Sequence, residues 1–129
     1  MRHLTRIGLA VLLVALAGGC GKERPMLAGG KPVSHWVEAL RSPDARLRKQ
    51  AAFKLGNVGL ADPSALPSLV GALQDRDAGV RREAILALLK CGPAAQEAVS
   101  ALRVLQRHDP DARVRTHAAR ALEKIQDAP

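Results

Sequence analysis

Apolar residues recur three and four positions apart along most of this chain, and polar residues occupy the positions between them. Residues at these spacings share one face of an α-helix, so the pattern predicts amphipathic helices rather than strands. A short apolar run alternates with a longer one, which predicts pairs of antiparallel helices. The apolar runs cover residues 33–40, 47–58, 66–73, 80–91, 98–105 and 114–125.

A seven-residue segment with a shared pattern, here called the heptad, leads into each longer run. Its third residue is Asp and its seventh residue is Arg in every copy. The copies lie at residues 42–48, 75–81 and 109–115, so they begin 33 and 34 residues apart. A period of that size is typical of a solenoid, in which each unit buries its apolar face against its neighbours.

The composition agrees with closely packed helices. The only aromatic residues are Trp36, which we expect in the core or as a cap on the first unit, and Phe53. A core of Ala, Leu and Val suits stacked helices better than a β-sandwich, which favours aromatic and β-branched residues. We therefore predict an all-α fold, an α-solenoid of three helix pairs with six antiparallel helices. The predicted units cover about residues 32–59, 64–92 and 94–126.

The sequence also predicts where the second helix of each pair begins. Ser42 and Asp75 have the side-chain oxygen with which an N-cap residue accepts a free amide proton. Asp109 with Pro110 restarts the third unit, because Pro suits the first helical position. An Asp then falls in the first helical turn of each unit, where the helix dipole favours a negative charge. These residues are Asp44, Asp77 and Asp111.

Two columns of the repeat alignment become charged in a terminal unit. They are Phe53/Leu86/Arg120, charged in the third unit, and Lys54/Ala87/Ala121, charged in the first. Terminal units of a solenoid need a polar outer face. We therefore expect these three units to form the whole array, as a monomer.

The first 19 residues have the layout of an export signal. Arg2, His3 and Arg6 form a basic start, and residues 7–17 form an uncharged, mostly apolar run. This run is too short for a permanent transmembrane helix. The net charge is +8 for the whole chain, and removing the leader leaves +6, from 18 basic and 12 acidic residues. That excess permits binding of phosphates, anionic lipids or acidic proteins without selecting among them.

The end of the leader, Leu16-Ala17-Gly18-Gly19-Cys20-Gly21, resembles the lipobox of bacterial lipoproteins. The resemblance implies that Cys20 becomes the first mature residue, with diacylglycerol on its sulfur and an acyl chain on its amino group. Several acyl chains on one residue anchor a protein stably to a membrane. Ala17 stands where the motif usually has Leu, so cleavage by an ordinary signal peptidase is the alternative. Gly21 is not the Asp that is associated with inner-membrane retention of such lipoproteins, so the resemblance slightly favours the outer membrane.

The segment after Cys20 has no helical or strand period. Residues 21–31 contain Gly, Pro and both signs of charge, a composition typical of a flexible linker. We therefore predict that residues 20–31 are a lipidated cysteine and tether, which hold the folded part, residues 32–127, near the bilayer. The protein would face the periplasm or the exterior.

The repeats also resemble a known family. The pattern Asp-x-x-Val-Arg-x-x-Ala-x-x-x-Leu, as in residues 111–122, is similar to the short HEAT-type repeat first associated with phycobilin lyases. Residues 77–88 keep the pattern, and residues 44–55 have Leu47 in place of Val. The resemblance implies a scaffold of stacked helix pairs that serves for binding in many unrelated settings.

One Arg recurs at the start of the second helix in every unit, where the helix dipole disfavours a positive charge. These residues are Arg48, Arg81 and Arg115. One interpretation, which the family resemblance also implies, is a structural ladder that compensates for this position. In such a ladder each Arg pairs with Asp44, Asp77 or Asp111 of its own or an adjacent unit.

A second interpretation joins the repeated Arg to their neighbours as a basic ridge along the second helices, the layer that usually lines the concave face of such solenoids. The variable neighbours are the candidates for partner binding. They are Arg46, Lys49, Arg82 and Arg113. Such a ridge suits a partner protein with an acidic surface.

No residues assemble into a recognisable catalytic or metal-binding motif. The sequence has no Gly-x-Ser-x-Gly, no phosphate-binding Gly loop and no paired carboxylates in an apolar setting. Cys91 falls at an apolar repeat position and is predicted to be a small buried residue. His35, His108 and His117 have no zinc-like spacing. We therefore expect no enzymatic activity, no metal and no cofactor.

The sequence as a whole favours a non-enzymatic scaffold that is exported, anchored to a membrane and bound to another protein at the cell envelope. The alternative is a lyase subunit or cofactor-attachment chaperone, which only the resemblance to phycobilin lyase repeats suggests. Nucleic-acid binding is not expected, because export leads to the wrong compartment and the chain has almost no aromatic residues to stack on bases.

Overall fold

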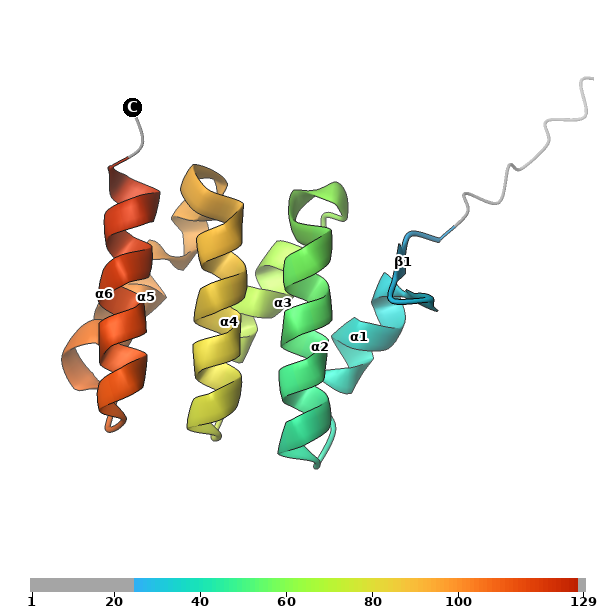
Figure 1. Cartoon of the computed structure of the whole chain (residues 1–129), viewed down its shortest axis with the longest axis horizontal. Helices are drawn as coiled ribbons and strands as arrows, with labels where there is room; N and C mark the ends of the chain where they lie inside the picture. The colour runs from blue at the N-terminus through green and yellow to red at the C-terminus, as the bar shows by residue number, and fades with distance from the viewer. Residues whose placement is uncertain (1–24, 128–129) are drawn as a thin grey trace, which may run out of the picture.

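The computed structural model of the protein describes residues 25–127, so the predicted leader and Cys20 lie outside the described residues. These residues form six α-helices, which stack as helix pairs (Figure 1). In each pair a shorter helix precedes a longer one. The helices are α1 (Val33–Ala39), α2 (Ala45–Val58), α3 (Ala65–Ala72), α4 (Ala78–Cys91), α5 (Val99–His108) and α6 (Ala112–Gln126).

The helices form two layers (Figure 1). The longer helices α2, α4 and α6 lie side by side in one layer, and α1, α3 and α5 lie behind them. Helix α4 packs against both α2 and α6, and each longer helix also packs against the shorter helix of its own pair. This arrangement confirms the predicted all-α solenoid, because each pair buries its apolar face against the next pair.

An aspartate begins each longer helix, two residues later than predicted. The N-cap residues are Asp44, Asp77 and Asp111. Their side chains accept a hydrogen bond from a backbone N–H in the first turn at 2.9 to 3.0 Å. Ser42, Asp75 and Asp109 lie outside the helices and accept the N–H of the N-cap residue two positions on. Both positions carry a capping side chain, but the later residue is the cap, because its carbonyl oxygen accepts the first hydrogen bond of the helix.

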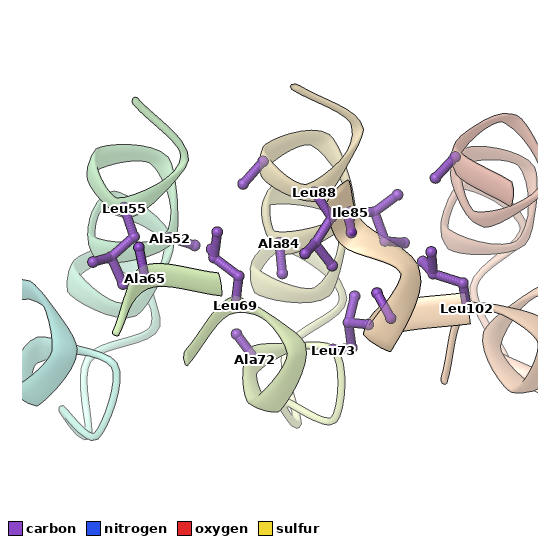
Figure 2. Close-up of a cluster of buried hydrophobic side chains, with 14 of the residues drawn as sticks. Ala52, Leu55, Ala65, Leu69, Ala72, Leu73, Ala84, Ile85, Leu88 and Leu102 are labelled. Atoms are coloured by element: carbon purple, nitrogen blue, oxygen red, sulfur yellow. The ribbon is translucent and has the colours of Figure 1, made fainter. Parts of the chain in front are cut away.

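The core is one continuous cluster of buried aliphatic side chains between the two layers (Figure 2). Leu55 on α2, Leu69 on α3 and Leu88 on α4 have no exposed surface, and Leu102 on α5 extends the cluster into the third pair. Burying one such side chain contributes about 1.5–3 kcal/mol. Many aliphatic contacts therefore replace the large aromatic side chains that this chain lacks.

Small residues set the distance between α2 and α4. A Cβ added at Gly56 on α2 would lie 2.6 Å from the Cβ of Ala87 on α4 and 3.0 Å from its Cα. Gly in the middle of a helix destabilises it by about 0.5–1 kcal/mol relative to Ala. The close approach of the two helices is the reason why Gly56 is nevertheless favourable here.

A β-hairpin covers the first helix pair, where the sequence predicts a flexible tether. Strand β1 (Leu27–Ala28) pairs with the antiparallel strand β2 (Lys31–Pro32). Gly29 and Gly30 between them have φ angles of 58° and 79°, the conformation that a two-residue hairpin turn requires. The tether prediction is therefore wrong for residues 25–31, because glycine-rich composition does not distinguish a linker from a tight turn.

Trp36 explains why the hairpin docks at this end of the solenoid. Its side chain is buried, and its indole N–H donates a 2.7 Å hydrogen bond to the carbonyl oxygen of Ala28 in β1. The Nζ atom of Lys54 on α2 lies 6.0 Å from the centre of the indole ring and within reach of Gly29. Trp36 is thus a core residue, and Lys54, predicted to face no neighbour, contacts the hairpin instead.

The other column predicted to mark an end of the array does not lie between units. Phe53 is 44% exposed and Leu86 is 36% exposed, and both lie on the outer side of the longer-helix layer. The tight backbone contact of α2 with α4 lies at Gly56, three positions further along. The prediction that Phe53 and Leu86 stack against the next unit is therefore wrong, because each residue step rotates a side chain by about 100° around the helix.

The stretch Ala78–His108 is long and apolar enough, by length and composition alone, to cross a membrane. The structure divides it into α4 and α5, because Gly92 has a φ of 57° and the 3₁₀ segment η2 (Gly92–Ala98) turns the chain. A similar 3₁₀ turn, η1 (Gly59–Ala61), lies between α2 and α3. Both halves of the apolar stretch contribute side chains to the solenoid core.

The close contact at Gly56 gives a test of the helix packing. We expect Gly56→Ala to lower the free energy of unfolding by about 1–3 kcal/mol, because the new methyl group overlaps Ala87. Thermal unfolding measures this loss. Gly71→Ala on α3 is the control, because a Cβ there has open space and stabilises a helix by about 0.4–1 kcal/mol. Equal melting temperatures for the two variants would contradict the proposed packing.

Candidate functional site

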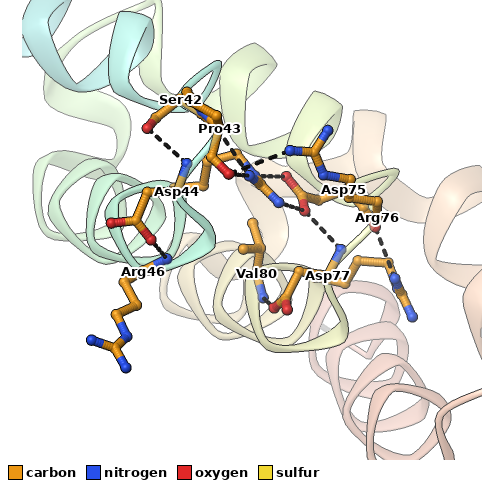
Figure 3. Close-up of polar contacts among 10 residues, drawn as sticks. Ser42, Pro43, Asp44, Arg46, Asp75, Arg76, Asp77 and Val80 are labelled. Carbon is orange, nitrogen blue, oxygen red and sulfur yellow. Dashed lines mark hydrogen bonds and ion pairs between the residues drawn. The ribbon is translucent and has the colours of Figure 1, made fainter.

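An arginine on α2 ties the first unit to the second (Figure 3). The Nε and Nη2 atoms of Arg48 donate hydrogen bonds to the two carboxylate oxygens of Asp75, at 2.8 and 3.0 Å. Its Nη1 atom donates to the carbonyl oxygens of Ser42 and Pro43, at 2.9 and 3.1 Å. The guanidinium group thus joins the turn before its own helix to the turn before α4, and its side chain is almost fully buried.

Arg81 on α4 repeats this arrangement one unit later. Its Nε and Nη2 atoms donate to the carboxylate of Asp109 at 2.8 and 3.0 Å, and its Nη1 atom donates to the carbonyl oxygen of Asp75 at 2.8 Å. Arg115 on α6 donates to the carbonyl oxygens of Asp109 and Pro110, and within residues 25–127 it has no carboxylate partner. The ladder of the described chain therefore contains two bidentate ion pairs.

The ladder uses different carboxylates from those predicted. The predicted partners were Asp44, Asp77 and Asp111, whose oxygens instead cap their own helices. Each Arg reaches the turn before the next longer helix, where Asp75 and Asp109 stand. The sequence does contain a signal for this choice: the equivalent residue is Ser42 in the first unit, where no preceding unit of the described chain offers an arginine.

Hydrogen bonds in the ladder and at the helix caps also shift the pKa values of the residues involved. Burial by itself raises the pKa of Asp75, but hydrogen bonds from Arg48 and from the Asp77 N–H, with the charges of Arg48 and Arg76, bring it below its usual range. The hydrogen bond to Asp75 raises the pKa of Arg48. Hydrogen bonds from backbone N–H groups lower the pKa of Asp111. A carboxylate with a lowered folded-state pKa stabilises the fold above its unfolded pKa, and this stabilisation is lost as the pH falls through the folded value.

The outer side of the longer-helix layer brings the predicted basic ridge together. Positions three and four apart form one stripe on each of α2, α4 and α6. We call this surface the α2/α4/α6 face. It consists of Arg46, Lys49, Gln50, Phe53 and Asn57 on α2, Arg82, Glu83, Leu86 and Lys90 on α4, and Arg113, Thr116, His117, Arg120 and Lys124 on α6. All four ridge residues lie on it, and Figure 3 shows the Arg46 side chain pointing away from the ladder.

The α2/α4/α6 face concentrates the positive charge of the protein. It carries seven Lys and Arg side chains and one acidic side chain, Glu83. Residues 25–127 contain 16 Lys and Arg against 11 Asp and Glu, a net charge of +5, so the described residues outside this face have a net charge of −1. None of the seven basic side chains takes part in a salt bridge among the described residues. The face therefore attracts anionic groups.

Sequence reasoning missed the second half of this face. Lys90 lies eight residues after Arg82, and Arg120 lies seven residues after Arg113, which is two helical turns in each case. Lys124 lies one further turn along α6. Helical spacing in the sequence predicts these positions, whereas the repeat column Phe53/Leu86/Arg120 wrongly places Arg120 at an end of the array instead of on the outer surface.

Two apolar side chains interrupt the charge on neighbouring helices of this face. Phe53 and Leu86 hold equivalent repeat positions and are partly exposed. The Nζ atom of Lys90 lies 5.0 Å from the centre of the Phe53 ring and donates a 3.1 Å hydrogen bond to the side chain of Asn57. A hollow of about 350 Å³ with an almost wholly apolar wall lies beside Phe53. It is lined by Arg46, Lys49, Gln50, Phe53 and Glu83.

The other candidate residues do not gather into a site. Cys91 is half-buried, and burial raises the pKa of its thiol, which disfavours the reactive thiolate. His35, His108 and His117 belong to no group of three His, Cys, Asp or Glu side chains within residues 25–127 that could hold a metal ion.

The ladder gives a second stability test. We expect Arg81→Ala to lower the free energy of unfolding by about 3–5 kcal/mol, because it leaves the buried carboxylate of Asp109 without its partner. Arg115→Ala is the matched control and should cost only about 1–2 kcal/mol, because it removes hydrogen bonds to backbone carbonyls alone. Denaturant titration measures both losses. An Arg81→Ala variant as stable as the wild type would refute a stabilising ladder.

Comparison with known proteins agrees with this geometry. The model of a protein family described as HEAT repeats matches residues 33–123. The match covers well over half of the chain and includes residues of all six helices. No curated protein matches the chain. Stacked antiparallel helix pairs, repeated Asp N-caps and a family match over the whole solenoid lead to one conclusion: this chain belongs to the HEAT-repeat family.

Proposed function

We propose that the protein is an exported, membrane-anchored and non-enzymatic scaffold that binds another protein at the cell envelope through the α2/α4/α6 face. HEAT repeats generally mediate protein–protein interactions. The observation that carries the proposal is the concentration of seven basic side chains, none of them in a salt bridge within residues 25–127, on one row of helices. A complementary partner has an acidic surface.

The rigidity of the helix row supports this proposal. The ion pair from Arg48 to Asp75 and the close contact of Gly56 with Ala87 fix α4 relative to α2. Basic side chains on these helices therefore start from backbone positions that these two contacts hold in place. Preorganisation of this kind lowers the entropy lost on association.

The proposed anchor is Cys20, and it rests on the sequence alone. A polypeptide chain extends by at most about 3.6 Å per residue. Strand β1 begins at Leu27, so a lipid on Cys20 would keep it within about 25 Å of the bilayer surface. The docked hairpin would then carry this restraint directly to the first helix pair. Gly21 favours the outer membrane as the site of anchoring.

The proposed scaffold acts as a monomer, without a cofactor. The alternative, a lyase subunit or cofactor-attachment chaperone, rests on the repeat resemblance alone, and a tetrapyrrole absorbance band on the purified protein would favour it. Sedimentation as a concentration-independent dimer would contradict the monomer.

Capture of the partner from solubilised membranes tests the binding face. We expect Lys49→Glu, Arg82→Glu and Arg113→Glu together to reduce the captured partner about tenfold, because opposite charges then face the acidic surface. The melting temperature should stay near the wild-type value, since none of the three side chains takes part in a salt bridge among the described residues.

The matched control makes the same change of charge away from this face. It combines Arg41→Glu, Arg103→Glu and Arg107→Glu, all exposed on the shorter-helix layer or its turns. Capture by this control should equal capture by the wild type. Equal losses for both triple variants would show that net charge, and not the α2/α4/α6 face, governs binding.

Detergent phase separation tests the anchor. We expect Cys20→Ser to move the protein from the detergent phase to the aqueous phase and to abolish lipid labelling, because no sulfur remains to carry diacylglycerol. Cys91→Ser is the control and should partition like the wild type, since Cys91 lies within the folded solenoid. Unchanged partitioning of the Cys20→Ser variant would reject lipidation.

A further inference from the structure

We infer that the Phe53–Leu86 pair is the anchor point for an acidic peptide segment of the partner, which places a large apolar side chain in the hollow beside Phe53. The inference rests on the proposed function, because it identifies the part of the partner that meets the α2/α4/α6 face. In this interaction the two apolar side chains would supply most of the affinity, and the basic side chains around them would orient the segment.

The position of the apolar pair is the first argument. Phe53 and Leu86 project from neighbouring helices at equivalent repeat positions, with exposed fractions of 44% and 36%. The other large exposed apolar residues of the described chain lie off this face. They are Met26, Leu27, Leu60 and Val104. Single exposed apolar residues are ordinary on a protein surface, but these two share the basic face with the apolar hollow beside Phe53.

The Phe53 ring is also held in place. The ammonium group of Lys90 lies 5.0 Å from the ring centre, and its hydrogen bond to Asn57 links α4 to α2 across the ring. A cation over an aromatic ring contributes about 0.5–1 kcal/mol at an exposed site. The ring therefore presents one fixed surface to a ligand and loses little side-chain entropy when it is covered.

The charges around the hollow select the chemistry of the segment. Arg46 and Lys49 line the hollow from α2, and Arg82 follows the equivalent stripe on α4. Glu83, the one acidic side chain of the face, lines the same hollow. Two cations and one carboxylate thus line the hollow, and Arg82 adds a cation on the neighbouring helix, so the net charge favours a segment that carries Asp or Glu. The site thus fits an apolar side chain flanked by Asp or Glu.

The same features disfavour the other anionic partners. A phosphate backbone that follows the basic stripes would approach Glu83 and find one aromatic ring for stacking. A bilayer surface offers no side chain to fill a hollow, so it would use the charges of the face but not the hollow beside Phe53. The observations therefore favour a peptide over nucleic acid or a membrane.

Peptide selection tests the inference on the full-length protein in detergent micelles. Random peptides displayed on phage are selected on the immobilised protein, and the most enriched peptide is labelled and titrated by fluorescence anisotropy. We expect enriched peptides to combine Asp or Glu with Phe, Leu, Met or Trp. Phe53→Ala and Leu86→Ala should each raise the Kd about tenfold, as expected for anchor side chains, while circular dichroism shows an intact helical fold at the assay temperature.

Leu60→Ala is the matched control, because Leu60 is also exposed but lies off the face, in η1. It should bind the peptide like the wild type. Enrichment of basic or purely apolar peptides, or a Phe53→Ala variant with wild-type Kd, would overturn the inference. Binding to phosphatidylglycerol vesicles or to a poly-dT oligonucleotide that is lost in Phe53→Ala would overturn it in favour of those partners.

Capture from solubilised membranes separates this inference from the proposed function. Loss of capture by the triple variant of Lys49, Arg82 and Arg113 with full capture by Phe53→Ala would keep the proposed function and reject the anchor. Full capture by both variants would reject the proposed function as well. Loss of capture by both supports an apolar anchor within a basic surface.

Discussion

The bidentate ion pair between an arginine of one unit and an aspartate of the next is the interaction on which the stack depends. Arg48 and Arg81 are almost fully buried, and each finds its carboxylate only when the following unit is in register. A buried charge without a partner destabilises a protein by several kcal/mol. The ion pairs therefore penalise every misaligned stacking of helices whose aliphatic surfaces are otherwise alike, and they specify one register.

The ion pairs act together with the small side chains between the longer helices. Gly56 and Ala87 let α2 and α4 approach closely toward their C-terminal ends, and Arg48 connects the turns at their N-terminal ends. Contacts between units thus occupy the sides of the longer helices that face one another, and the core occupies the side toward the shorter helices. On the outer side the contacts between units involve Lys90, Asn57 and Phe53, and the other side chains differ from unit to unit and remain available for binding.

The α2/α4/α6 face offers two kinds of side chain to a partner, charged ones and apolar ones. In the proposed interaction, exposed Arg and Lys side chains would act over a distance, accelerating association and orienting an acidic partner. Phe53 and Leu86 would act only on contact, and burying apolar surface there would slow dissociation. Such a surface would select its partner by the arrangement of acidic and apolar groups on that partner, and not by the partner's charge alone.

The sequence by itself determined the all-α solenoid, because the helical period, the heptads before the longer helices and the 33- and 34-residue spacing all specify the same helix pairs. It also identified the four basic residues of the face, since helical spacing places them on one side. Tertiary structure alone decided which aspartates pair with arginines, because Asp75 and Asp77 both suit a helix start and only stacking brings Asp75 to Arg48. It likewise decided that the Gly-Gly segment is a hairpin over Trp36 and that Phe53 is exposed, since both depend on a neighbour distant in sequence.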